Sequence, residues 1–388
     1  MDGERLKILR LSRDMSLDDL ASAAGEIVSK QMLSRYERGL STPTARVVTA
    51  LAKALGVPVS KMLEQPRISV EPVAYRKQAS LKKGDEHRIT SLLTTELELR
   101  VRLQEANRFP PPTIPILDIS AKSLEDAESA AIRIREEWGL GEAPIMSLVD
   151  EMESRLVHVI EVDAPPTFDG LSLVAYDEHR TPTAVAAAIR RGVPGDRQRL
   201  SLAHELGHIL LRLADDMDEE KAAYRFASAL LAPAAALRRE IGERRSAVDL
   251  KELVILKQRY KMSLMAVVYR LRELAIISEN HAKDWFMEIR ARGWGKVEPW
   301  EVSPEEPTWM KMNVLRAMAE GVLRRDEAKE MLGNNDLEIP GQSSDLQELM
   351  QMTRDERRRM LSESVADSAG EYEGDAEWLN ASLEGSRS

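Results

Sequence analysis

Apolar residues at helical spacing predict five short helices in the first 65 residues. Ser16 precedes the second helix as an N-cap, and Asp19 stands at its capping-box position. Gly25, Gly39 and Gly56 follow the second, third and fourth helices, where glycine commonly ends a helix. The apolar positions that share this spacing are Leu6, Leu9, Leu17, Leu20, Leu33, Val47, Leu51 and Leu55.

The pattern changes after residue 66, where a short strand and then a long helix are predicted. Apolar residues over 68–73 suit a strand, and a basic polar link follows at 76–83. A charged, amphipathic helix from about 85 to 107 suits a spacer or a dimerisation element, and ordinary packing fits its pattern equally well. The proline-rich run 109–115 is a stiff, polyproline-like joint, so we place a domain boundary near it.

An α+β order is predicted for the next stretch of the chain. Ser123 caps one helix, and Pro144 begins a second helix over 144–152. Three strands follow at 156–162, 171–176 and 183–189, because these runs are apolar or partly alternate. Helices followed by strands and then by another helix are typical of an α+β domain.

The chain beyond residue 233 reads as helical. Helices over 250–259 and 263–275 form a second pair shaped like a helix-turn-helix, which we expect to pack on the preceding domain. Tryptophan and proline concentrate between 285 and 309 and predict an ordered but irregular lobe. An amphipathic helix is predicted over 344–361. Seven acidic residues and one arginine after residue 361 predict a disordered tail.

The candidate chemistry lies in one apolar helix that carries the H-E-x-x-H sequence from His204 to His208. Histidines four residues apart lie on one face of a helix, so both imidazoles can reach a single ion. Glu205 stands beside the first histidine, where it can act on a water without ligating the metal itself. The spacing therefore predicts a hydrolytic metal site.

A hydrolytic zinc site needs a third protein ligand and one open position. Glu220 lies in the next predicted helix, which begins near Asp218, and offers that ligand. The segment between the two helices is short and acidic, so Asp218 and Glu219 are alternative ligands. The competing interpretation is a buried helix whose two histidines only form hydrogen bonds.

Composition narrows the functional classes. The chain has 388 residues, enough for two or three domains, and 43% of them are hydrophobic, as in soluble globular proteins. It contains no cysteine, which excludes disulfides and thiolate metal sites and leaves histidine and carboxylate as ligands. A net charge of −10 argues against a protein coated in nucleic acid but allows one small DNA-reading module. Without a signal-peptide pattern or an apolar run of membrane-spanning length, we expect a cytoplasmic protein with no membrane partner.

The region around the H-E-x-x-H helix resembles the ImmA/IrrE family of metallopeptidases. Members pair an H-E-x-x-H helix with E-x-x-A-x-x-F-A-x-x-L-L-x-P, and this chain reads E-K-A-A-Y-R-F-A-S-A-L-L-A-P from Glu220. The resemblance implies that His204, His208 and Glu220 hold zinc and that Glu205 is the general base. The family usually has Asn or Asp four residues after the ligand Glu, whereas this chain has Tyr224, so we expect weaker zinc binding or activity.

The segment that precedes the H-E-x-x-H helix is also similar to that family. An Asp-Gly turn before a strand corresponds to Asp169 and Gly170, and an arginine shortly before the histidines corresponds to Arg197 or Arg199. The sequence does not identify the group that stabilises the oxyanion; Tyr224 is the nearest polar candidate along the chain.

The run S-x-x-x-x-S-x-x-E-x-G over residues 29–39 resembles the XRE, or lambda-repressor-like, helix-turn-helix family. In such a fold the N-terminal side chains of the third helix enter the major groove. Residues 1–65 hold ten basic and eight acidic residues, a weak positive charge that favours binding to DNA as a homodimer. A helical bundle used for protein contacts is the alternative. The implied DNA-contacting residues are Lys30, Gln31, Ser34 and Arg35 at bases or nearby phosphates, and Arg38 at phosphate.

These observations predict a multidomain, mostly α protein. The predicted parts are a helix-turn-helix domain at 1–65, a linker with a spacer helix at 66–120, an α+β zincin-like metallopeptidase domain at 121–278, a helical C-terminal extension at 279–361 and an acidic disordered tail at 362–388. The function expected is a zinc-dependent metalloendopeptidase coupled to a DNA-binding domain. The family resemblance implies a repressor protein as substrate and a role in stress or mobile-element control. The alternative is a transcriptional regulator whose peptidase-like domain senses or binds a partner without cleaving it.

Overall fold

The computed structural model describes residues 1–65, 68–73, 81–112, 114–295 and 298–332. The chain divides into two compact units, residues 1–322 and residues 323–388. The described part of the second unit holds helix α16 (Arg325–Leu332). Among the described helices, none combines the length and the apolar character needed to cross a membrane. The helix predicted over 344–361 and the acidic tail lie outside the described residues.

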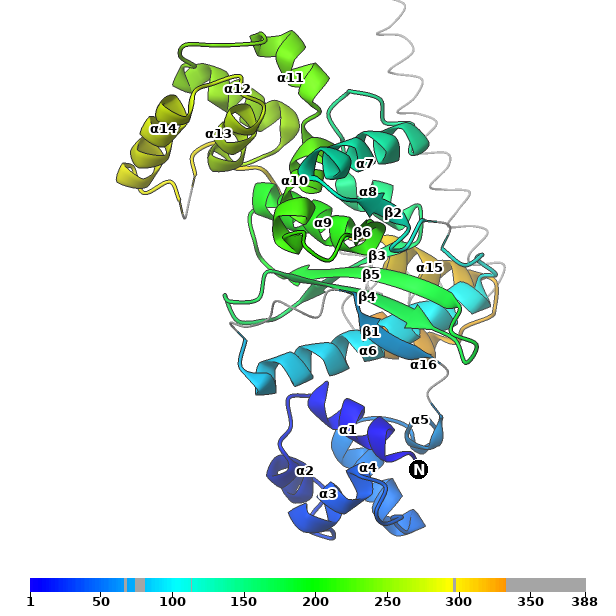
Figure 1. Cartoon of the computed structure of the whole chain (residues 1–388). Helices are drawn as coiled ribbons and strands as arrows, with labels where there is room; N and C mark the ends of the chain where they lie inside the picture. The colour runs from blue at the N-terminus through cyan, green and yellow to red at the C-terminus, as the bar shows by residue number, and fades with distance from the viewer. Residues whose placement is uncertain (66–67, 74–80, 113, 296–297, 333–388) are drawn as a thin grey trace, which may run out of the picture. The chain divides into compact units, whose positions relative to one another are not determined.

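Five short helices form the N-terminal bundle, as the apolar spacing predicts (Figure 1). Ser16 and Asp19 complete a capping box at the start of the second helix, because each side chain accepts a hydrogen bond from the backbone N–H of the other residue. Gly56 ends the fourth helix in the left-handed conformation, with a φ of 63°. The helices are α1 (Gly3–Leu11), α2 (Leu17–Ala23), α3 (Lys30–Glu37), α4 (Ala45–Leu55) and α5 (Val59–Leu63).

The bundle closes around the predicted apolar face. Leu6, Leu9, Leu20, Leu33 and Leu51 are all fully buried in one cluster. The third helix buries only two of its own residues in this core, so most of its polar side chains remain at the surface.

A four-stranded sheet with the strand order β1-β4-β5-β3 is the centre of the second part of the chain. β3 runs parallel to β5, while β4 is antiparallel to both of its neighbours, so the sheet is mixed. The strands are β1 (Ser69–Pro72), β3 (Val157–Val162), β4 (Gly170–Tyr176) and β5 (Pro182–Arg190).

Alternation along the strands divides the sheet into two faces. On β4, Leu171, Leu173 and Ala175 point into one cluster, whereas Val174 belongs to the other. Ser172 lies on the same face as Val174, where its side chain meets helix α9 (Gly195–Leu210). The position of Ser172 on this face matters for the site described below.

One face of the sheet is covered by α6 (Lys83–Ala106), the helix expected to be a spacer. Figure 1 shows α6 along one face of the sheet. Ile89, Leu93, Leu97 and Val101 of this helix share a core cluster with the inward residues of β3, β4 and β5. This helix therefore completes a hydrophobic core, which favours the ordinary-packing interpretation of its sequence pattern over the spacer interpretation. A free amphipathic helix and a packed one have the same periodicity, so the pattern alone could not distinguish them.

The other face of the sheet carries α7 (Leu124–Glu137), α8 (Leu148–Glu153), α9 and α10 (Glu219–Leu231). Ser123 caps α7, as predicted. The helix predicted to begin at Pro144 begins only at Leu148, because Ser147 accepts the capping hydrogen bond from Asp150 N–H. A second, two-stranded sheet pairs β2 (Ile119–Ala121) in parallel with β6 (Leu211–Leu213); neither short strand was predicted.

The remaining helices of the first unit are α11 (Ala234–Ile241), α12 (Leu250–Tyr260), α13 (Leu264–Glu273), α14 (Glu279–Ala291) and α15 (Trp309–Ala319). The predicted pair over 250–275 is present as α12 and α13, and its apolar face belongs to the same core cluster as α9 and α10. The irregular lobe expected over 285–309 is present only in part. Residues 285–291 belong to α14, whereas residues 298–308, which precede α15, have no helix or strand. The predicted domain limits at residues 65, 120 and 278 stay predictions.

Candidate metal centre

Helices α9 and α10 bring three metal-ligating side chains together. One donor atom from each of His204, His208 and Glu220 lies within 4.8 Å of the other two. The Nε2 atoms of the two histidines are 3.0 Å apart, and the Glu220 carboxylate lies 3.5 Å from each of them. Two imidazole nitrogens and a carboxylate oxygen are a donor set that zinc commonly takes, so these residues fit a zinc ion.

Close packing of the two helices allows this approach. Gly207 lies between the two histidines, and a Cβ at this position would come within 3.2 Å of the Phe226 ring and 3.3 Å of Ala223 Cα on α10. A larger residue in place of Gly207 would push α10 away from α9. The same glycine therefore sets the distance between Glu220 and the histidines.

Glu205 points into the sheet side of the site. Its side chain is 7% exposed, and Ser172 Oγ donates a hydrogen bond to Glu205 Oε2 at 2.6 Å. A Cβ at Gly170 would lie 2.5 Å from Glu205 Oε1, so a larger residue there would displace the carboxylate from its present position. Burial raises the pKa of Glu205 above its ordinary value, and the nearby His208 and the Ser172 hydrogen bond partly oppose this shift.

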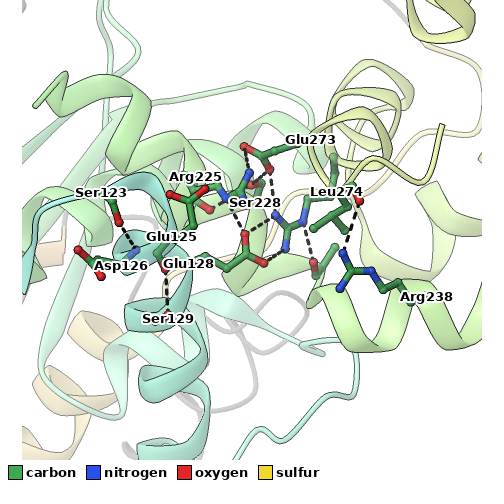
Figure 2. Close-up of polar contacts among 12 residues, drawn as sticks. Ser123, Glu125, Asp126, Glu128, Ser129, Arg225, Ser228, Arg238, Glu273 and Leu274 are labelled. Atoms are coloured by element: carbon green, nitrogen blue, oxygen red, sulfur yellow. Dashed lines mark hydrogen bonds and ion pairs between the residues drawn. The ribbon is translucent and has the colours of Figure 1, made fainter. Parts of the chain in front are cut away.

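A buried cluster of charged side chains holds α10 in place near the candidate ligand Glu220. Figure 2 shows Arg225 of α10 between Glu128 of α7 and Glu273 of α13. Arg225 Nε lies 2.6 Å from the Glu128 carboxylate, and its Nη1 lies 2.9 Å from that of Glu273. Arg270, whose side chain is fully buried, contacts both carboxylates and donates to the backbone carbonyl of Ala232. These contacts join three helices one to two turns away from Glu220.

The N-terminal end of α9 is held by a segment that sequence reasoning did not connect to the site. Arg199, 1% exposed, pairs with Glu305 and donates to Ile145 O. Lys257, fully buried, pairs with Asp196 of α9 at 2.5 Å and with Glu298 at 2.9 Å. Sequence separations of 41 to 106 residues give no local signal for these pairs.

Arg197 and Arg199, the two alternatives for the arginine shortly before the histidines, lie in different environments. Arg199 is the buried one just described. Arg197 lies at the mouth of the site, half exposed, and pairs with Asp169 next to the Gly170 turn. Arg197 is therefore the arginine that lies beside the site.

A cleft of about 230 Å³ opens beside the cluster and contains Glu205 as well as the three candidate ligands in its wall. Tyr224 also lines it: its ring lies 4.2 Å from the His204 ring, centroid to centroid, and the residue is 50% exposed. Apolar residues of the same wall are Leu81, Phe168, Leu171 and Leu200. The cleft thus offers polar groups at its base and apolar surface around them.

Four of the candidate DNA-contacting residues lie on α3, and the fifth, Arg38, is the C-cap residue of that helix. Lys30, Gln31, Arg35 and Arg38 are exposed, and Ser34 is partly exposed. Lys30 Nζ is 2.5 Å from Asp18 on α2, a contact between two exposed side chains that phosphate could replace. The structure therefore presents the five residues on the surface, and their role in DNA binding stays a prediction.

Two family matches correspond to these two parts of the chain. Residues 6–62 match the family described as Helix-turn-helix, and residues 188–272 match the family described as IrrE N-terminal-like domain. The chain therefore combines an N-terminal helix-turn-helix domain with an IrrE-like domain, which confirms both predicted resemblances.

Two curated proteins are similar to this chain over part of its length. The HTH-type transcriptional regulator SutR of Escherichia coli (strain K12) is 42% identical over 73 residues, which cover 19% of this chain and 39% of SutR. The cryptic phage CTXphi transcriptional repressor RstR of Vibrio cholerae is 26% identical over 110 residues, which cover 28% of this chain and 97% of RstR. Both similarities support a DNA-binding regulatory function for part of the chain.

Proposed function

We propose that this protein is a zinc metalloendopeptidase that cleaves a repressor protein, and that its helix-turn-helix domain binds an operator. The observation that carries the proposal is the convergence of His204, His208 and Glu220 beside the buried carboxylate of Glu205 in one cleft. The match to the IrrE-like family and the similarity to two named transcription regulators support it.

The two histidines and Glu220 would hold the zinc ion from one side, because α9 and α10 approach it from the wall of the cleft. When bound, zinc polarises the scissile carbonyl and lowers the pKa of water. The open side of the cleft then receives the peptide, with Arg197 and Asp169 at its mouth.

Glu205 moves the proton in this reaction. Its carboxylate accepts a proton from the water whose oxygen forms the new bond to the carbonyl carbon, and it delivers that proton to the departing amide nitrogen as the C–N bond breaks. Ser172 fixes the carboxylate by its 2.6 Å hydrogen bond. Tyr224 is the polar side chain of the cleft that we assign to the developing oxyanion.

The substrate and the regulated genes follow from the pairing of the two domains. A peptidase attached to a DNA-binding domain acts where a regulator is bound, and repressor cleavage would relieve repression at that operator. The phage repressor RstR is a regulator of a mobile element by its name, so we propose mobile-element or stress control for this chain as well.

The test is cleavage of candidate repressors by the full chain. The purified protein is incubated with repressor proteins encoded next to its gene, and fragments are identified by mass spectrometry. Glu205→Gln should lower the cleavage rate by about 10²- to 10⁴-fold while leaving zinc content unchanged, since only the proton acceptor is lost. A Glu205→Gln protein that relieves repression in cells as well as wild type would support the non-cleaving regulator instead.

A further inference from the structure

We propose that Glu219 is a positioning residue that orients His208 for zinc. This inference rests on the proposed function, because it concerns the same metal centre. Glu219 Oε1 lies 3.3 Å from Nδ1 of His208, while Nε2 of the same ring lies 3.5 Å from Glu220 Oε1. The two adjacent acids of α10 thus contact opposite nitrogens of one imidazole.

Helix geometry explains why neighbouring acids can divide these two tasks. Asp218 caps α10 by accepting a hydrogen bond from Lys221 N–H, which places Glu219 and Glu220 in the first turn. Consecutive residues of an α-helix point about 100° apart, so the two carboxylates leave the helix in different directions. One reaches the donor cluster, and the other reaches the far edge of the His208 ring.

Glu219 and Glu220 also line different cavities, one on each side of His208. Glu220 lines the cleft of about 230 Å³ together with His204 and Glu205. Glu219 lines a different cavity, of about 460 Å³, on the side of Gly207 and Ala223. His208 borders both cavities, so its ring forms part of the wall between them.

An imidazole that binds a metal through one nitrogen usually donates its other N–H to a carboxylate or carbonyl. Such a contact fixes the tautomer, the ring orientation and the basicity of the ligating nitrogen. A Glu219 carboxylate at Nδ1 would hold the proton there and leave the Nε2 lone pair for zinc. Glu219 therefore need not touch the ion to increase the affinity for it.

The ligand and the positioning residue can be distinguished by metal binding in the full-length protein. Glu219→Ala should weaken zinc binding by about 10- to 100-fold, measured in competition with a chromophoric chelator. It should also change the visible absorption spectrum of the cobalt(II)-loaded protein, because His208 would no longer be held in one orientation. Glu219→Gln should recover part of the affinity, since an amide oxygen can still accept the Nδ1 proton.

Asp216→Asn is the matched control, because it removes one negative charge from the exposed loop that precedes α10. It should leave both the zinc affinity and the cobalt spectrum as in wild type. Equal losses in Asp216→Asn and Glu219→Ala would mean that general acidity of the loop attracts the ion, which would overturn the proposal.

Two further results would contradict it. Wild-type affinity and an unchanged cobalt spectrum in Glu219→Ala would remove any role for Glu219 at the metal. A loss of zinc as complete as that of Glu220→Ala would make Glu219 a direct ligand. Neither measurement depends on peptide cleavage, so a wild-type protein that binds zinc but cleaves no repressor would contradict the proposed function and leave this test valid.

Discussion

The candidate metal cluster between α9 and α10 and the exposed face of α3 hold their candidate functional side chains in opposite ways. His204, Glu205 and His208 are each 7% exposed. Ser172 Oγ lies 2.6 Å from Glu205 Oε2, and the Nε2 atoms of the two histidines are 3.0 Å apart, so neighbouring groups set the directions of these side chains. Gln31 and Arg35 on α3 are exposed, so water rather than protein surrounds much of their surface. Protein contacts hold the side chains of the first region, whereas solvent surrounds much of the side chains of the second region.

This difference decides how much chemistry can be inferred from each region. In the cluster, the donor types and the distances between them favour one class of ligand, because two imidazole nitrogens and a carboxylate are a donor set that zinc commonly takes. On α3, the fold selects only which side chains face outward. Which bases they contact depends on the DNA, so the helix indicates a class of function and leaves the operator open.

The largest effect should come from removing a metal ligand. Purified wild-type protein should contain about one zinc ion per chain, and Glu220→Ala should lose most of it, because two imidazoles alone complete only half of a four-coordinate site. Metal content can be measured by elemental analysis after dialysis. Zinc retention in Glu220→Ala at the wild-type level would exclude Glu220 as a ligand and would end the contrast between an organised site and an open surface.

The sequence predicted the cluster because its geometry is local. The i, i+4 spacing places His204 and His208 on one helix face, and the downstream motif that starts at Glu220 begins the next helix. The same holds for the N-terminal bundle, where caps such as Ser16 and Gly56 define helix ends within a few residues. Local rules sufficed for these elements.

Contacts across long sequence separations could not be predicted in this way. Ser172 on β4 orients Glu205, and Glu305 pairs with the buried Arg199, yet neither residue differs in type or spacing from ordinary surface residues. Helix α6 is the same case, since only the opposing strands reveal that its apolar stripe is covered. Glu220, the third candidate ligand, was identified with the help of the family resemblance, and its ligand role stays a prediction.

An intermediate effect should come from the buried charges that anchor α10. Glu128 accepts hydrogen bonds from Arg270 at 2.6 and 2.9 Å and lies 2.6 Å from Arg225. Glu128→Gln should lower the free energy of unfolding by about 3 kcal/mol, because both Arg225 and Arg270 would lose a charged ion-pair partner. Denaturant unfolding with a linear extrapolation gives this value.

Glu136→Gln is the control for this change, because Glu136 lies on the same helix with an exposed side chain. It should alter stability by less than about 0.5 kcal/mol. Burial alone would raise the pKa of Glu128, but the hydrogen bond and charge of Arg270, with those of Arg225, outweigh it and lower the pKa below its ordinary value. The difference between wild type and Glu128→Gln should therefore be present above the ordinary carboxyl pKa and shrink as the pH falls through the lowered one. A difference that does not depend on pH would contradict the ionic account.

The smallest effect should come from α3, and it should depend on sequence. Gln31 is exposed near the start of this helix, where a side chain that enters the major groove can pair with adenine. Gln31→Ala should weaken binding of the full chain to its operator by about 1–3 kcal/mol while changing non-specific binding little. The operator is first selected from a random duplex pool, and both affinities are then measured at one fixed salt concentration, since phosphate contacts make affinity depend on salt.

Arg38→Ala is the comparison on the same surface. Arg38 is exposed just beyond the last turn of α3, at the helix C-cap, so we expect it to contact phosphate rather than a base. Its loss should weaken binding to every duplex alike and reduce the slope of log affinity against log salt by about one. If Gln31→Ala lowered the affinity for operator and random DNA equally, Gln31 would be a phosphate contact rather than a base contact. If the full chain selects no duplex at all, the exposed face of α3 binds protein, and its partner must then be sought among proteins.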